Sequence, residues 1–174
     1  MLLYKTHISI YAVKSMDLQK VWENSGDFEA ISVFIRKVYD EFIAPDFPEE
    51  GNRRFYQFID PEALKKRFEE PDSLLTARMQ SRIVGVIGTR EMNHICLFFV
   101  SPEEQGRGIG RLLFHAMAKK CRENYPEISD LTVNSSPYSV PVYENLGFKA
   151  SDSMQERDGI TYLPMKFQFS AKAL

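Results

Sequence analysis

The stretch Val100–Lys120, VSPEEQGRGIGRLLFHAMAKK, decides how the chain folds. An apolar run ends at Val100, a Ser-Pro turn follows, and glycines stand at 106, 108 and 110 before apolar residues recur at helical spacing. This pattern predicts a strand, a glycine-rich turn and an amphipathic helix that ends near residues 125–126. The first amide groups of a helix have no partner within it and lie at the positive end of its dipole. Because glycines leave such amides accessible, we expect an anion to bind at this turn.

Further strands are expected on both sides of this segment. Three apolar runs at 73–79, 82–91 and 94–100, separated by short polar breaks, are typical of an antiparallel meander. Residues 131–136 predict a strand parallel to 94–100, since a crossover helix joins the two. A short helix then ends at Gly147, and strands follow at 148–150 and, after a turn at 158–159, at 160–167.

Two helices are expected before the meander. Apolar spacing predicts the first from Phe28 to Ile43, with Asp27 as its N-cap, and a second helix begins at Asp60-Pro61 and ends near residue 71. Residues 44–59 mix helix breakers with aromatic residues, and a strand is expected around 8–13. Together these elements predict a single α/β (α+β) domain over residues 1–174, with a mixed, mostly antiparallel sheet flanked by helices.

Composition excludes several classes of protein. The chain has 22 Lys plus Arg against 24 Asp plus Glu, so no global basic field attracts nucleic acid or an anionic membrane. No apolar run approaches the roughly 18 residues of a membrane span, and the first residues do not resemble a cleavable signal, so we expect a cytoplasmic protein. Cys96 and Cys121 have neither metal-knuckle nor redox spacing; we expect them to be buried and predict no metal site.

Two nucleotide-binding motifs fit the glycines poorly. A P-loop has Lys and then Ser or Thr after its last glycine, whereas Arg111 and Leu112 stand there. A dinucleotide-binding fingerprint has glycines at relative positions one, three and six and an acid at the end of the next strand. In this chain the third glycine is at position five, and the next strand ends in Asn134.

The spacing Gln105-x-x-Gly108-x-Gly110 after a strand resembles the coenzyme A signature of the GNAT superfamily of N-acetyltransferases. TVNSSPYSVPVYENLGF, residues 132–148, resembles the second motif of that family, and the likeness extends from Leu74 to about Met165. The resemblance implies acetyl-CoA as cosubstrate and a parallel strand pair that splays apart where the cofactor binds. It also implies a cofactor-binding core over about 74–167 and an acceptor side built from the helices of about 28–70.

Roles for individual residues follow from the same resemblance. The glycine turn would bind the pyrophosphate, with charge added by Arg107 or Arg111, and the backbone of 98–100 would face the acyl-pantetheine arm. Tyr143 matches the general acid of the family, and His94 stands where some protein-acetylating members carry a glutamate base. Tyr138, five residues before Tyr143, is expected to face away from it. The implied cofactor contacts are Phe98, Phe99, Val100, Gln105, Gly106, Arg107, Gly108, Ile109, Gly110, Arg111, Asn134 and Tyr143.

The expected reaction is transfer of an acetyl group to a primary amine of a small molecule or protein by direct attack, because neither cysteine has the context of a nucleophile. An amine of pKa near 10.4 is only about 0.04% neutral at pH 7, a cost of about 4.6 kcal/mol, so a base such as His94 or a water chain helps. The alternative is a non-catalytic acyl-CoA-binding module. Residues 42–59, with the acids Asp46, Glu49 and Glu50, would form a wall of the acceptor cleft. The acceptor and the question of a homodimer are left open.

Overall fold

A mixed sheet forms the centre of the protein. The computed structural model describes residues 18–23, 27–69, 73–157 and 159–169, and the strand expected around 8–13 lies outside them. Within the described residues, eight strands follow the order β1-β2-β3-β4-β5-β8-β6, with β7 beside β8. Their bounds are β1 Leu18–Glu23, β2 Leu74–Met79, β3 Arg82–Arg90, β4 His94–Val100, β5 Asp130–Ser135, β6 Lys149–Ala150, β7 Gln155–Arg157 and β8 Ile160–Gln168. The pair β4/β5 is parallel and the other pairs are antiparallel, as predicted.

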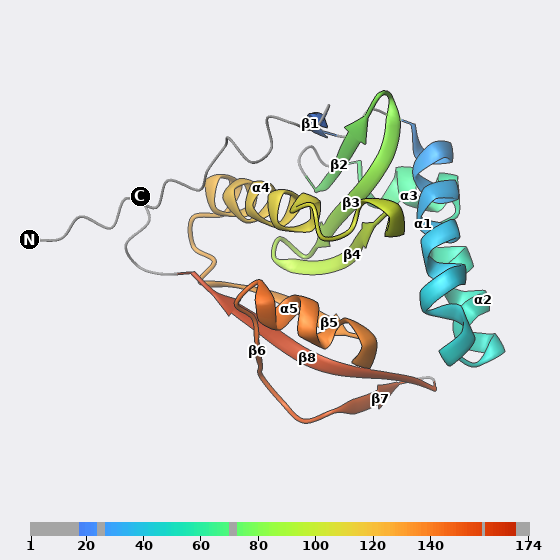
Figure 1. Cartoon of the computed structure of the whole chain (residues 1–174). Helices are drawn as coiled ribbons and strands as arrows, with labels where there is room; N and C mark the ends of the chain where they lie inside the picture. Colours follow the sequence, from blue (N-terminus) through green and yellow to red (C-terminus); the bar gives the residue numbers. More distant parts are fainter. Residues whose placement is uncertain (1–17, 24–26, 70–72, 158, 170–174) are drawn as a thin grey trace, which may run out of the picture.

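Helices cover both faces of this sheet (Figure 1). On one face lie α1 (Phe28–Phe42), α2 (Glu49–Phe58) and α3 (Pro61–Arg67); on the other lie α4 (Ile109–Asn124) and α5 (Val140–Asn145). Each set buries an apolar core of its own, because alternate residues of a strand point to opposite faces. Three short 3-10 turns complete the described elements: η1 Ala44–Asp46, η2 Pro102–Glu104 and η3 Pro137–Ser139.

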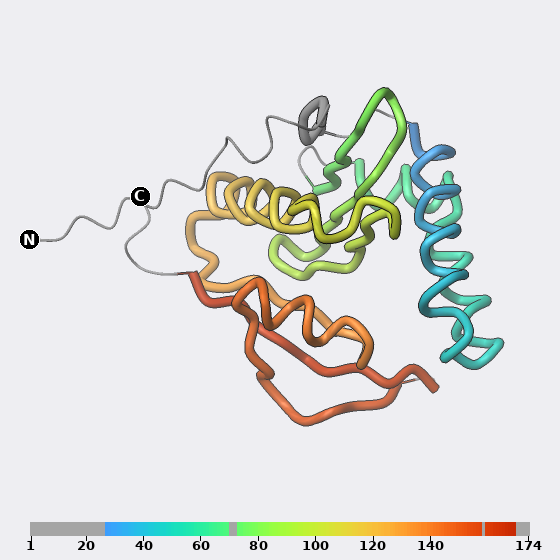
Figure 2. Tube along the Cα trace, viewed as in Figure 1, coloured from blue at the N-terminus to red at the C-terminus, as the bar shows by residue number. Residues whose placement is uncertain are grey.

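The parallel pair separates partway along its length. β4 and β5 are paired only at His94↔Thr132 and Ile95↔Val133, whereas β5 continues its pairing with β8 as far as Ser135. A register shift between β3 and β4 places an extra residue, Cys96, in β4 at this point, and such a bulge bends the strand. The sheet therefore opens beyond Ile95, with β1 to β4 on one side and β5 to β8 on the other (Figures 1 and 2).

Local sequence signals account for most of the elements. Asp27 caps α1 by accepting a hydrogen bond from the Ala30 amide (3.2 Å), and Asp60 caps α3 in the same way. The prediction was wrong about the end of α3, which stops at Arg67. It also missed β1, β7 and α2. α2 was not predicted because Pro48 and Gly51 disfavour a helix. In the structure Pro48 stands at its N-cap and Gly51 is buried close to Ile160, so neither residue breaks the helix.

Candidate functional site

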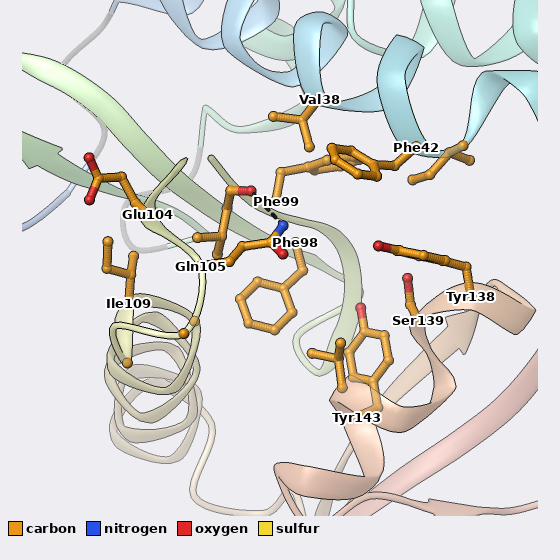
Figure 3. Close-up of a pocket in the computed structure, with 16 residues that line it drawn as sticks. Val38, Phe42, Phe98, Phe99, Glu104, Gln105, Ile109, Tyr138, Ser139 and Tyr143 are labelled. Carbon is orange, nitrogen blue, oxygen red and sulfur yellow. Dashed lines mark hydrogen bonds between the residues drawn. The ribbon is translucent and has the colours of Figure 1, made fainter. Parts of the chain in front are cut away.

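A cavity of about 460 Å³ lies where the sheet opens (Figure 3). β4 and the glycine loop (residues 105–108) form one side, and the end of α1 and the η3–α5 segment face them. Its lining consists of Val38, Phe42, Ile43, Phe98, Phe99, Val100, Glu104, Gln105, Gly106, Gly108, Ile109, Gly110, Tyr138, Ser139, Val142 and Tyr143. The cavity thus brings together most of the residues that the sequence singled out.

The glycine loop presents amide groups without partners. Gly106 and Gly108 have φ angles of +75° and +83°, a conformation that L side chains rarely adopt, and an added Cβ at either would meet nothing within 4 Å. Gly108 is the N-cap of the sixteen-residue α4 and offers no side chain to the first-turn amides. Within the described residues, no other hydrogen bond caps those amides. The loop therefore suits an anion such as a pyrophosphate.

Gly110 serves a different purpose from the other two glycines. Its φ is not positive, and an added Cβ would lie 3.5 Å from Phe98 Cζ, which is ordinary van der Waals contact. The expectation that all three glycines are needed for the same reason was therefore too broad. Backbone conformation requires glycine at 106 and 108 only.

Charged groups beside the loop are already paired. Glu104 is 7% exposed, and its carboxylate accepts a hydrogen bond from Arg107 (2.9 Å) and lies 3.6 Å from Arg82. Two guanidinium groups against one carboxylate leave this edge with a net positive charge. Neither Arg107 nor the exposed Arg111 is among the residues that line the cavity. The backbone amides are thus the nearest anion-binding groups in the lining.

The open end of β4 runs along the cavity. Its residues Phe98 to Val100 pair with β3 on one side only, since β5 has left the other edge. The side-chain amide of Gln105 donates a hydrogen bond to the Val100 carbonyl (3.4 Å), which ties the glycine loop to the end of the strand (Figure 3). The Phe98 ring packs beside Tyr143, at 6.0 Å between centroids.

Tyr143 on α5 directs a polar group into this apolar space. The residue is only 6% exposed, and its hydroxyl points into the cavity without a hydrogen-bond partner among the described residues (Figure 3). Burial, and to a lesser extent the nearby Cys96, raises the pKa of the Tyr143 phenol well above its ordinary value. The phenol therefore stays protonated at neutral pH and is available as a hydrogen-bond donor.

His94 and Asn134 lie apart from these groups. The Nδ1 atom of His94 is 2.9 Å from the Thr132 hydroxyl, where β4 and β5 are still paired, and four residues of strand, roughly 13 Å, separate it from Phe98. Burial is the main cause of a lowered His94 pKa. Asn134 is exposed at the end of β5, and neither residue is among those lining the cavity. Their roles as base and cofactor contact stay predictions.

A second cavity of about 300 Å³ adjoins the first. The two cavities share Phe42, Ile43 and Tyr138. The rings of Phe42 and Tyr138 are stacked, with 6.1 Å between their centroids. One wall is formed by Asp46, the last residue of η1, and by Phe47, which follows it. Another is formed by Gly159 and Thr161, at the start of β8. Figure 2 shows the end of α1 and the start of β8 facing each other here, although they are far apart in the sequence.

Tyr138 was misplaced by sequence reasoning. It was expected to face away from Tyr143, on the assumption that one helix carries both. Tyr138 instead belongs to the 3-10 turn η3 that precedes α5, and both tyrosines line the first cavity. Pro137 and Pro141, each in the first turn of its own short helix, were the signal that the segment contains two helices.

The described residues contain neither a metal-ligand cluster nor a membrane-spanning helix. Among the described residues, no three His, Cys, Asp or Glu side chains group as ligands for a metal ion. No helix in the described ranges has the length and apolar character that crossing a bilayer requires. Cys121 is buried as predicted, whereas Cys96 is half-buried.

A family model described as an acetyltransferase (GNAT) domain matches residues 43–169, well over half of the chain. The chain belongs to the GNAT acetyltransferase family. The matched region contains the whole glycine loop, the open end of β4 and Tyr143, but it begins after α1. No curated protein matches the sequence significantly.

Several solved structures share the fold at low sequence identity. A GCN5-related N-acetyltransferase from Rhodopseudomonas palustris has a TM-score of 0.70 and 19% identity, over 88% of this chain and 99% of that chain. PaiA N-acetyltransferase from Thermoplasma acidophilum, solved in complex with coenzyme A, has a TM-score of 0.69 and 16% identity, over 86% and 99%. The apo form of YjaB from Escherichia coli has a TM-score of 0.62 and 18% identity, over 84% and 95%.

Proposed function

We propose that this GNAT protein transfers the acetyl group of acetyl-CoA to a primary amine by direct attack. The observation that carries the proposal is that one cavity is lined both by the unpartnered amides of residues 106 and 108–110 and by the unpartnered hydroxyl of Tyr143. One group suits the phosphates of a coenzyme and the other suits the sulfur at its far end. Membership of the family and a structural neighbour solved with coenzyme A support the same choice of donor.

Each part of the cavity would hold one part of acetyl-CoA. The amides of the glycine loop would bind the pyrophosphate at the positive end of α4. The unpaired edge of β4 beyond Ile95 would bind the pantetheine arm through backbone hydrogen bonds, as an added strand does. Phe98 and Val142 would pack against its apolar atoms. The thioester would then lie near Tyr143.

Transfer forms a C–N bond and breaks the C–S bond of the thioester. The amine must first lose a proton, and the departing sulfur must be stabilised as a thiolate or thiol. Tyr143 would donate a hydrogen bond to that sulfur. Because its pKa is raised, the phenol would keep its proton and stabilise the thiolate by hydrogen bonding, without transferring the proton completely. A cysteine intermediate is not part of the proposal, because burial raises the pKa of both Cys96 and Cys121 to about 11 and keeps the thiols protonated.

Water in the cavity is the first acceptor of the amine proton in this proposal. Glu104, the acidic residue that lines the first cavity, points away from Tyr143 (Figure 3) and is already paired with Arg107. His94 does not line the cavity and would act only through a chain of water molecules. A His94→Gln variant distinguishes water from His94 as the base. If His94 is the base, the substitution removes the acidic limb of the pH profile of kcat/KM.

The test combines calorimetry with coenzyme A and detection of free thiol across a panel of amines. Tyr143→Phe should lower kcat by about 100-fold or more and leave the affinity for acetyl-CoA nearly unchanged, because only the hydroxyl is lost. Tyr138→Phe is the matched control: it removes a phenol from the same cavity on the exposed side. Wild-type turnover in Tyr143→Phe would remove this residue from the mechanism. Tight coenzyme A binding without thiol release from any amine would instead favour the non-catalytic module.

A further inference from the structure

We infer that the acceptor is an amine that carries a second positive charge, and that Asp46 binds this charge in the second cavity. The inference rests on the proposed function, because it names the class of acceptor for the same reaction. It comes from the position of Asp46, from the absence of other partners for its carboxylate and from the way in which its loop is held.

The two cavities form one route to the thioester position. They share Phe42, Ile43 and Tyr138, whereas Tyr143 lines only the first and Asp46 only the second. The stacked rings of Phe42 and Tyr138 stand between them and offer apolar surface to a hydrocarbon chain. A substrate that reaches Tyr143 by this route therefore passes two aromatic rings and leaves its far end beside Asp46.

Charge in the second cavity has one sign. Among the described residues that line it, Asp46 is the one ionisable carboxylic acid, and neither cavity includes a Lys, Arg or His in its lining. The Asp46 side chain has no ion pair or hydrogen bond within the described part of the chain. Glu50, four residues later, instead binds both Arg53 and Arg54, and these contacts lower its pKa to about 2. Glu49 has no such partner among the described residues either, but it lines neither cavity, so Asp46 is the unpaired acid of this segment that lines the route.

The structure holds Asp46 in place from both sides. The side-chain amide of Asn52 donates hydrogen bonds to the carbonyls of Ala44 (2.9 Å) and Phe47 (3.3 Å), which flank Asp46. The Asn52 oxygen accepts a hydrogen bond from the buried Tyr39 hydroxyl (2.7 Å). A carboxylate on a loop fixed in this way has less freedom to lose when it pairs with a ligand.

The reacting nitrogen is not the partner of Asp46. That nitrogen must be neutral when it attacks, and it must lie by the thioester in the first cavity. Asp46 therefore matches a different group, at the other end of an apolar chain. A terminal ammonium fits this position, a methyl group gains no ion pair, and a carboxylate would be repelled.

Three acceptors of equal chain length test the inference: 1,5-diaminopentane, pentylamine and 5-aminopentanoate. We expect kcat/KM to fall in that order, by about fivefold from the diamine to the monoamine and further for the amino acid. Asp46→Asn should lower kcat/KM for the diamine about fivefold and leave kcat/KM for pentylamine unchanged. The difference in kcat/KM between the diamine and 5-aminopentanoate should become smaller. Glu49→Gln is the matched control, since it removes the same charge three residues away but does not line either cavity.

Calorimetric titration of 1,5-diaminopentane into the wild-type protein and Asp46→Asn supplies a second readout that does not require turnover. We expect the variant to bind the diamine about fivefold more weakly. Equal kcat/KM for the three acceptors, an unchanged preference in Asp46→Asn, or turnover of other amines but none of these three would overturn the inference and leave the acetyltransferase proposal standing. Failure of the proposed function looks different: no heat with coenzyme A and no thiol from any amine, and the inference then fails with it.

Discussion

The two walls of the proposed active-site cavity are built by different means. The donor wall, formed by β4, the glycine loop and the start of α4, presents backbone groups whose positions follow from strand pairing and from two glycines with positive φ. The acceptor wall, formed by α1, η1 and α2, depends on side chains: Tyr39 stacks on Phe55 at 3.8 Å and bonds to Asn52, which holds the loop. A backbone wall suits a ligand that never changes. A side-chain wall can be adapted to different acceptors by substitution.

The largest effect is expected from substitutions in the donor wall. The double variant Gly106→Ala/Gly108→Ala should lower the affinity for acetyl-CoA by about 100-fold, because each alanine disfavours a left-handed conformation by about 1–2 kcal/mol. The loop would then relax and turn its amides away. Isothermal titration with coenzyme A measures the change.

Gly110→Ala is the control for that experiment, since its φ is not positive and its new methyl group would meet Phe98 at ordinary contact distance. We expect it to lose far less affinity than the double variant. An equal loss in both proteins would show that space, and not backbone conformation, explains the glycines.

A smaller effect is expected on the acceptor wall. Asn52→Ala leaves the buried Tyr39 hydroxyl without its partner and frees the loop that carries Asp46, so the free energy of unfolding should fall by about 1–2 kcal/mol. The KM for the amine should rise about fivefold, because the loop must be ordered again on binding. The KM for acetyl-CoA should not change.

Initial-rate kinetics with each substrate varied in turn, together with guanidinium unfolding, check this prediction. Asn52→Asp is a useful companion, since it keeps an oxygen for Tyr39 but loses the amide that donates to Ala44 and Phe47. A rise in the KM for acetyl-CoA equal to that for the amine would mean that the walls are not independent.

The smallest effect concerns His94, which lies where β4 and β5 are still paired. Burial and the neighbouring Arg90 lower the pKa of His94 below 6.5, and Glu91 opposes this in part. As the pH falls below 6.5, the unfolded chain binds a proton that the folded His94 does not, so the folded state loses stability between 6.5 and the lowered pKa. The stabilisation is fully present above pH 6.5.

Unfolding at about pH 7.5 and about pH 5.5, in wild type and His94→Gln, measures this dependence. The variant should lose less stability on acidification than the wild type. Some dependence will remain, since burial also lowers the pKa of His115. An identical loss in both proteins would show that His94 does not titrate as described.

The contrast between the walls also explains what the sequence could predict. Gln105 and Gly108 have fixed spacing because one loop conformation brings the Gln105 amide to the end of β4 and requires a positive φ at Gly108, so the donor wall and the order of the strands around it could be predicted. Tyr143 was found in the same way, from a motif that places it on a short helix. The opening of the sheet beyond Ile95 was expected from the family resemblance and is present.

In the acceptor wall α1 was predicted correctly, but the structure of the residues that follow it could not be predicted because tertiary contacts form it. α2 contains a glycine and follows a proline, and it is a helix because its aromatic residues pack on Tyr39 and its Gly51 fits against Ile160. The second cavity combines residues from η1, η3 and β8, which no local pattern relates to each other. Asp46 was singled out with Glu49 and Glu50 as a charge, but only the structure shows that Glu50 is already paired with arginines.

Amide NMR spectra during two titrations test the central claim most directly, that bare backbone amides at the start of α4 bind the pyrophosphate of the donor. One titration uses coenzyme A, and the other uses pantetheine, which has the same arm and no phosphate. We predict that coenzyme A shifts the amide signals of residues 106–111 together with those of 98–100, and that pantetheine shifts only the second group. Signals of 106–111 that stay unmoved by saturating coenzyme A would contradict the account.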